Sequence, residues 1–424
     1  MKKTVFGILS VILWVTTSAE ENWTRFRGDH GAGLSKQEAP TALDKNSLLW
    51  SAALPGPGSS SPVIWENLLF VTSEDRKNQT INLSCLDATK GSAKWTQKLK
   101  IGDYHLHRFN NTAASSPAVD ADKVVISWFD GAKSVAMLSA FDHSGKKLWD
   151  FEIGPLKSKH GANIHPVIHE DRVVICHLHL NGGYVGAISG KTGKAIWKTP
   201  YPGGSTSYVT PLIRLVTRPS GKGHEVIVAA TSIGMVGLDL KDGKEQWAVP
   251  KLMKERCIVS PFDVLAGTGD ENVLIAAGCK NGVYFTVRPP QLLKGDGWSK
   301  PEVVWKMDGK TPYVPTPVSD GAIVYALADG GALAAMDSLS GELLWKEQLP
   351  ANFYASPLLV GGKFYALSRE GEMFVAKVGK SYQEIARSPL SPGPEVQWTD
   401  ATPVAVNGKL FVRLGSRLDC FGQK

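Results

Sequence analysis

The chain has 424 residues and a formal net charge of +7, from 47 Lys and Arg against 40 Asp and Glu. The basic excess is spread along the sequence without a run of five or six like charges, which argues against a nucleic-acid-binding groove. The 5 cysteines include no CxxC spacing, so they exclude a disulfide scaffold and a thiol-based metal or redox motif.

The N-terminus has the pattern of a secretory signal peptide. Lysines at positions 2–3 precede an apolar run over residues 5–15, and Thr17-Ser18-Ala19 supplies the small residues of a cleavage site. We therefore expect residues 1–19 to be removed after Ala19, leaving a mature protein, residues 20–424, that is periplasmic or secreted. The alternative is an uncleaved anchor, but the run is short for a membrane span, and no second stretch is long enough.

A short phrase recurs along the mature chain: a small or polar residue, a proline and then an apolar stretch. The prolines of this phrase are Pro62, Pro117, Pro166, Pro211, Pro261, Pro317, Pro357 and Pro403. They lie about 40 to 56 residues apart, a period that is typical of propellers and solenoids.

A second phrase follows most of these prolines and ends in a tryptophan. In the third unit it runs from Ala187 through Thr192-Gly193-Lys194 to Trp197. The glycine suits a turn that needs a positive φ. The tryptophan is large enough to pack against the neighbouring unit.

Runs of β-branched and aromatic residues between the two phrases, such as residues 123–126 and 172–175, predict strands. Each unit then has four antiparallel strands, and no amphipathic helix pattern of useful length is present in the mature chain. The sequence therefore predicts an all-β fold, a single eight-bladed β-propeller over residues 20–424. The fifth unit carries an apparent insertion at residues 288–300, and the seventh ends at residues 385–387 without a tryptophan.

The two ends of the chain predict how the ring closes. The last unit starts at Pro403 and stops after three strands, whereas Ser47-Leu48-Leu49-Trp50 is a tryptophan strand that precedes the first unit. We expect residues 44–50 to complete the last blade, which places the two ends of the domain side by side.

The tryptophan phrase resembles that of the pyrroloquinoline quinone-like repeat propellers, in which Ala, Asp, Thr-Gly-Lys and Trp span eleven residues. The third unit matches it with Ser189 in the aspartate position. The segment Trp23-Thr24-Arg25-Phe26-Arg27-Gly28 is similar to the W-x-x-F-R-G opening of secreted bacterial quinoprotein-like propellers. This resemblance covers essentially the whole mature chain and implies the propeller fold.

Two kinds of protein with this architecture differ in function. Quinone-dependent dehydrogenases have long insertions around the cofactor, and the alcohol-oxidising ones have an adjacent cysteine pair. The outer-membrane protein assembly factor is a non-enzymatic propeller attached through a lipoprotein cysteine. This chain has only short insertions, no Cys-Cys pair and no cysteine before Cys85.

Loops that enter the innermost strands of a propeller, and loops that follow the second strands, lie on one face around the channel mouth. Residues just before each proline should therefore form a ring there. The predicted ligand-binding residues are Asn111, Asn163, His165, Tyr208, Arg256, Tyr313, Tyr354, Trp398 and Asp400. Amide and aromatic side chains suit a polar ligand, although polar residues line any water-filled funnel.

Histidines are concentrated in the first half of the chain. His105 and His107 are two residues apart, as are His177 and His179, so each pair faces one side of an extended strand. These four imidazoles are the predicted ligands of a divalent metal such as Zn²⁺ or Cu²⁺. The alternative is that they are solvated residues at strand ends.

The sequence contains no GxSxG elbow and no GxxxxGK[ST] phosphate loop. It favours a monomeric binding or scaffold module that presents the channel mouth to a protein or saccharide partner, without a cofactor or nucleic acid. The alternative is an oxidoreductase that depends on pyrroloquinoline quinone or a metal and is reduced to the bare propeller.

Overall fold

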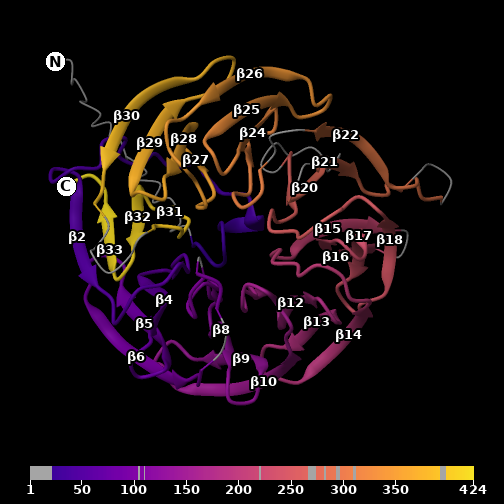
Figure 1. Ribbon diagram of the computed structural model, residues 1–424, viewed down its shortest axis with the longest axis horizontal. Coiled ribbons are helices and arrows are strands. Elements are labelled where there is room, and N and C mark those ends of the chain that lie inside the picture. The colour runs from indigo at the N-terminus through magenta and orange to yellow at the C-terminus, as the bar shows by residue number, and fades with distance from the viewer. Residues whose placement is uncertain are drawn as a thin grey trace, which may run out of the picture.

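The computed structural model describes residues 22–103, 106–108, 110–218, 221–265, 274–280, 283–292, 297–308, 312–391 and 398–424. In these ranges eight sheets follow one another around a central axis (Figure 1). The prediction of an all-β, eight-bladed propeller is confirmed. The expected signal peptide, residues 1–19, lies outside the described residues.

The four strands of each blade pair antiparallel, and in blades one to seven they follow sequence order from the channel to the rim. Blades one and two consist of β3 (Val63–Trp65), β4 (Leu68–Asp75), β5 (Thr80–Asp87) and β6 (Ala93–Lys100), then β7 (Ala118–Val119), β8 (Val124–Asp130), β9 (Val135–Phe141) and β10 (Lys147–Pro155). Blades three and four consist of β11 (Val167–His169), β12 (Arg172–His179), β13 (Gly182–Ser189) and β14 (Ala195–Tyr201), then β15 (Leu212–Arg218), β16 (Gly221–Ala230), β17 (Gly234–Asp239) and β18 (Glu245–Val249).

The second half of the ring repeats this order. Blades five and six consist of β19 (Phe262–Asp263), β20 (Ile275–Cys279), β21 (Val283–Arg288) and β22 (Glu302–Asp308), then β23 (Val318–Ser319), β24 (Ile323–Leu327), β25 (Ala332–Asp337) and β26 (Leu343–Gln348). Blades seven and eight contain β27 (Leu358–Val360), β28 (Lys363–Leu367), β29 (Glu372–Lys377) and β30 (Gln383–Pro389), then β31 (Val404–Val406), β32 (Lys409–Leu414) and β33 (Arg417–Phe421).

Burial differs between the strands of a blade. Every residue of β9 is buried, whereas in the rim strand β10 only Trp149 and Ile153 are buried. The middle strands are covered by a neighbouring blade on both faces, so their sequences are nearly continuous apolar runs. This explains why those runs were the clearest strand signals in the sequence.

Blade eight is completed from the N-terminal end of the chain. Strand β2 (Leu48–Ala53) pairs antiparallel with β33, and Trp50 lies opposite Cys420 (Figure 1). The predicted closure is confirmed, but the strand lies later than residues 44–50. The carboxylate of Asp44 accepts hydrogen bonds from the backbone N–H groups of Asn46 and Ser47, which form a turn before the strand.

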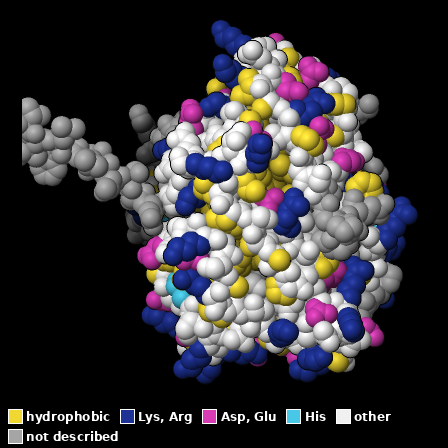
Figure 2. All heavy atoms as spheres, turned by 90° about the vertical axis from the view of Figure 1, so that its left-hand side faces the viewer, with side chains coloured by type: hydrophobic (Ala, Val, Ile, Leu, Met, Phe, Trp, Pro, Cys, Tyr) yellow, Lys and Arg dark blue, Asp and Glu magenta, His cyan; other side chains and the backbone are white. Residues whose placement is uncertain are grey.

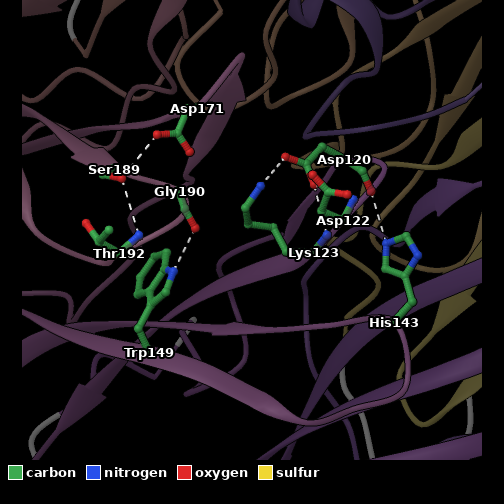
Figure 3. A network of polar contacts seen from close by, with 9 residues as sticks. All are labelled: Asp120, Asp122, Lys123, His143, Trp149, Asp171, Ser189, Gly190 and Thr192. Atoms are coloured by element: carbon green, nitrogen blue, oxygen red, sulfur yellow. Dashed lines mark hydrogen bonds and ion pairs between the residues drawn. The ribbon is translucent and has the colours of Figure 1, made fainter.

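Tryptophans connect most blades to the next. The indole of Trp149 donates a 2.8 Å hydrogen bond to the carbonyl oxygen of Gly190 in blade three (Figure 3). Gly193 has a φ of 66°, and an added Cβ would lie 2.7 Å from the Trp149 ring. In this blade Ser189 replaces the usual aspartate, accepting a hydrogen bond from the Thr192 N–H and donating one to Asp171.

Two junctions lack this docking contact. The Trp247 indole donates instead to the carboxylate of Glu225 in its own blade, beside the irregular blade five. Blade seven ends at β30 without a tryptophan, as predicted. There the segment before β2 contacts the blade, because the Leu43 N–H donates to Ser388 Oγ and the Tyr365 hydroxyl donates to the Ala39 carbonyl.

An unpredicted feature is the path of the N-terminal segment, residues 22–35. It begins at blade one, where Trp23 pairs with Ile64, and ends as β1 (Leu34–Ser35), which pairs parallel with β27 of blade seven. Between these points it crosses the channel through the short 3-10 turn η1 (Asp29–Gly31). The indigo ribbon in Figure 1 reaches the middle of the ring along this path.

All five cysteines, Cys85, Cys176, Cys257, Cys279 and Cys420, are unpaired and buried. Burial raises the pKa values of Cys85, Cys176 and Cys420 to about 12, so these thiols act as small apolar side chains. On the face shown in Figure 2, basic and acidic side chains are interspersed. No helix among the described residues is both long enough and apolar enough to cross a membrane.

Candidate functional site

A cavity of about 410 Å³ lies at the channel mouth. Phe26, from the segment that crosses the channel, lines it, and the Phe26 ring lies 4.7 Å from the ring of His165, centroid to centroid. The predicted ring residues that line the cavity are Asn163, His165, Tyr208, Arg256, Tyr313, Tyr354 and Asp400. The remaining two, Asn111 and Trp398, line an adjoining cavity of about 570 Å³ that also contacts Asp400. The nine predicted residues therefore line these two cavities at the channel mouth, which we call the funnel. Their role in binding a ligand stays a prediction.

One wall of the funnel is cationic. The Arg256 guanidinium donates from Nε to the Tyr313 hydroxyl at 2.8 Å, and its Nη1 lies against Nε2 of His160. Burial, and then the charge of Arg256, lower the pKa of His160 to about 4, so at neutral pH this imidazole is uncharged and can accept a hydrogen bond. Among the described residues, no carboxylate lies within ion-pair distance of Arg256.

Another part of the mouth, between blades seven and eight, is organised around Arg369. This side chain forms a two-pronged ion pair with Asp400, at 2.8 and 3.0 Å. Its guanidinium carbon lies 3.8 Å from the centroid of the Tyr354 ring and 4.6 Å from that of Trp398. Burial raises the pKa of Asp400, while the hydrogen bonds from Arg369 oppose that shift. Three predicted residues, Tyr354, Trp398 and Asp400, thus contact Arg369, which was not among the predicted residues.

A sequence signal for the missed residues did exist. Arg369 follows β28, Lys280 follows β20, and both contribute to the mouth from the loop after the second strand of a blade. That loop lies on the same face as the residues before each proline, but the predicted ligand-binding residues all come from the segments before the prolines. Asp329 follows β24 in the same way and accepts hydrogen bonds from the backbone N–H groups of Tyr313 and Val314.

Several predicted ligand-binding residues also hold neighbouring blades together. Nδ1 of His165 accepts a hydrogen bond from the Ser116 N–H, and Oδ1 of Asn163 accepts one from the Ser115 hydroxyl. The Asn111 amide donates to Ser59 Oγ at 2.7 Å. Burial lowers the pKa of His165 to about 3, which keeps this Nδ1 acceptor unprotonated. These side chains therefore stabilise the contacts between blades, whether or not they also contact a ligand.

The predicted histidine ligands are only partly described. His105 lies outside the described residues, so the four-histidine metal site stays a prediction. His107 lines the funnel, with its ring centroid 4.5 Å from that of His160. The His177 and His179 ring centroids lie 4.9 Å apart, and Nε2 of His177 is hydrogen-bonded to the Pro155 carbonyl. Within the described ranges, these three histidines form no cluster of metal-ligating atoms with one another.

Pyrroloquinoline quinone, after which this type of repeat is named, is a planar tricarboxylate. Of the cations at the mouth, Arg369 is paired with Asp400, and Lys280 lies 3.8 Å from Glu255. Only Arg256 among these three side chains has no carboxylate partner. These three cations therefore do not form a matched set of donors for the three carboxylates of the quinone.

The fold and the funnel define an eight-bladed propeller with a polar and aromatic cavity at the mouth of a plugged channel. The model of the family described as outer membrane protein assembly factor BamB matches residues 26–136, 133–280 and 299–414. The chain therefore belongs to this family of pyrroloquinoline quinone-like repeat propellers. A search of curated proteins found no match.

Two solved structures with TM-scores above 0.5 show the same fold at low sequence identity. The crystal structure of BamB from Moraxella catarrhalis is 14% identical with a TM-score of 0.60, covering 88% of this chain and 99% of that one. The computationally designed Ika8 protein is 13% identical with a TM-score of 0.57, covering 89% and 99%. The quinohemoprotein alcohol dehydrogenase from Comamonas testosteroni is 13% identical with a TM-score of 0.49, covering 96% and 81%.

Proposed function

We propose that this protein is a binding propeller whose funnel accepts an acidic segment of a partner protein. The observation that carries the proposal is Arg256. Its guanidinium lies on the wall of a partly enclosed cavity, oriented by Tyr313 and His160, with no carboxylate partner among the described residues. A carboxylate that enters the cavity would form charge-assisted hydrogen bonds with it, which are stronger than neutral ones.

The other walls suit the same ligand. Tyr208, Tyr313 and Tyr354 provide aromatic surface for the stem of a bound side chain. Lys280 also lines the cavity, with the carboxylate of Glu255 3.8 Å from its ammonium group. Asp400 does not repel an acidic ligand strongly because Arg369 pairs with it. A cavity of about 410 Å³ has room for a short peptide segment and not for a folded domain.

We place this binding function in the periplasm or outside the cell, on the sequence pattern of residues 1–19. We further propose that the protein acts as a monomer and needs no cofactor to bind. Cell fractionation of the full chain and of a chain that starts at residue 20 tests the location. The location proposal fails if both chains are found in the cytoplasm.

An array of short acidic peptides, each with an Asn- and Gln-containing counterpart, tests the ligand class directly. We expect acidic peptides to bind and the Arg256→Gln variant to bind them at least tenfold less tightly, because a hydrogen bond to a charged group contributes about 1.5–3 kcal/mol. Lys346→Gln removes one positive charge from an exposed position of β26 and should leave binding unchanged. Equal binding by the Arg256→Gln variant would contradict the proposal.

Two further measurements address the other candidate functions. Binding of neutral oligosaccharides in preference to the acidic peptides would indicate a saccharide partner instead. Addition of pyrroloquinoline quinone with Ca²⁺, followed by dye reduction with alcohols and aldoses, tests the oxidoreductase alternative. Turnover in that assay would replace the binding proposal.

A further inference from the structure

A cluster of potential metal ligands lies away from the funnel. His169, Glu170 and His224 each offer one ligand atom, and these atoms lie within 4.8 Å of one another. Strand β11 starts just after the funnel residue His165 and ends at His169, so the cluster is at the far end of that strand from the funnel. It joins blade three to blade four, because His224 belongs to β16.

Local backbone geometry holds the first two ligands together. His169 pairs with Arg172 across β11 and β12, which leaves a two-residue turn, and Glu170 occupies its first position with a φ of 52°. His224 is fixed by the β15–β16 ladder opposite Leu215, and its carbonyl accepts a hydrogen bond from the Leu240 N–H. The two imidazoles are therefore presented by rigid strands and the carboxylate by a tight turn.

The contacts of the two histidines leave ligand atoms free. The ring centroids of His169 and His224 lie 4.2 Å apart at an interplanar angle of 62°. Nε2 of His169 is buried and has no hydrogen-bond partner, although a buried polar atom is usually satisfied by protein, water or an ion. This buried nitrogen atom is therefore available to coordinate a metal ion.

We propose that His169, Glu170 and His224 form a Zn²⁺ site that links blades three and four. Two imidazoles and one carboxylate are a ligand set that Zn²⁺ accepts, with a water completing a tetrahedral coordination sphere. Bond lengths of about 2.0–2.1 Å place tetrahedral ligand atoms about 3.4 Å apart. The three ligand atoms already lie within 4.8 Å of one another, and the exposed Glu170 side chain can adjust its distance to the two histidines.

The surroundings of the cluster are compatible with a cation. Arg172 lies 3.7 Å from the Glu170 carboxylate, a weak pairing that a metal ion can replace. His30, in η1, is close enough to act electrostatically on the His169 imidazole, but His30 is not part of the ligand group. The channel-crossing segment therefore passes near the site without supplying a ligand.

Calorimetric titration of chelator-treated protein with Zn²⁺ tests the assignment. We expect one Zn²⁺ per chain, a higher melting temperature with Zn²⁺, and a visible absorption band of tetrahedral type when Co²⁺ is used instead. Loss of a residue that only supports a metal ligand weakens metal binding roughly 10–100-fold. His224→Gln and Glu170→Gln each remove a ligand itself, so each should weaken Zn²⁺ binding by at least this factor. Glu170 is an exposed turn residue, so this second variant remains informative if His224→Gln disturbs folding.

The matched control is Glu66→Gln, because Glu66 is exposed, has the same φ of 52° and occupies the same position in the two-residue turn of blade one. It should keep the Zn²⁺ stoichiometry and affinity of the unchanged protein. The proposal is overturned by any of three results: no stoichiometric Zn²⁺, undiminished affinity in both ligand variants, or loss of the ion in the control alone. Peptide binding at the funnel is measured separately and is expected to be the same with and without Zn²⁺.

Discussion

Nη2 of Arg27 donates a 2.6 Å hydrogen bond to the carbonyl oxygen of Pro317, which lies 290 positions further along the chain. Nη1 of the same side chain reaches the Thr316 carbonyl at 2.7 Å, and Nη2 also reaches that of Ala32. Burial lowers the pKa of Arg27 to about 9, so the side chain stays charged at neutral pH with carbonyl oxygens as its hydrogen-bond partners. The N-terminal segment is therefore anchored inside the channel.

Replacing Arg27 with methionine should strongly destabilise the protein. The change leaves several buried carbonyl oxygens without donors, and we expect a loss of roughly 3–5 kcal/mol in the free energy of unfolding. Denaturant titration followed by tryptophan fluorescence measures it. Lys244→Met, at an exposed ion pair with Asp242, should change stability by less than about 0.5 kcal/mol. A similarly small change in both variants would show that the hydrogen bonds of Arg27 do not contribute to stability.

Stability should fall in acid because of His165. Its pKa is about 3 in the folded protein and 6.5 when unperturbed, so between these values the unfolded chain binds a proton that the folded protein does not. The resulting loss of stability is absent above about pH 6.5 and grows toward pH 3, to roughly 5 kcal/mol in all. Unfolding measured from pH 7 to pH 4 should show a shallower decline for His165→Asn. An unchanged slope would contradict this assignment.

The glycine under each docking tryptophan should not tolerate a side chain. At Gly193 an added methyl group meets the Trp149 ring at 2.7 Å, and φ is 66°. We expect Gly193→Ala to lower stability by about 1–3 kcal/mol. Gly330→Ala is the control, because an added Cβ there has no heavy atom within 4 Å. Thermal melts of both variants would test the difference, and equal melting temperatures would argue against the docking contact.

Removing the strand that closes the ring should prevent stable folding. A chain that starts at Gly58 lacks β2, so the edge of β33 loses its partner and Trp50 no longer docks on blade one. Open strand edges pair with other chains, so we expect aggregation in size-exclusion chromatography and no cooperative melt. A chain that starts at Asn22 keeps every described contact and should remain folded. A stable monomer from the shorter chain would contradict the role of β2.

The repeat was predictable because it rests on local chemistry. A tryptophan that follows a turn glycine, as in Gly193 and Trp197, marks a rim strand regardless of what the rest of the chain does. Proline before the innermost strand sets the position of each blade, so the residues ahead of it could be assigned to the channel mouth. The bounds of β2 were less predictable, because the turn at Asp44 depends on side-chain hydrogen bonds.

The path of residues 22–35 was not predictable in the same way. Trp23, Arg25 and Arg27 belong to the segment that resembles the opening of related propellers. Their partners are Ile64, Pro211 and Pro317, which are far apart in sequence. The partners are backbone carbonyl oxygens, which every residue carries, so no residue type in the sequence marks them.

The sequence by itself determined the number of blades, their four-stranded form, the closure by an N-terminal strand and the face that carries the funnel. Each of these follows from a periodic pattern of apolar, turn and tryptophan residues. Only the tertiary structure decided that Arg369 pairs with Asp400, that Arg256 lies beside His160, and that His169 meets His224. These contacts join side chains from different blades, and their distances depend on how the ring closes.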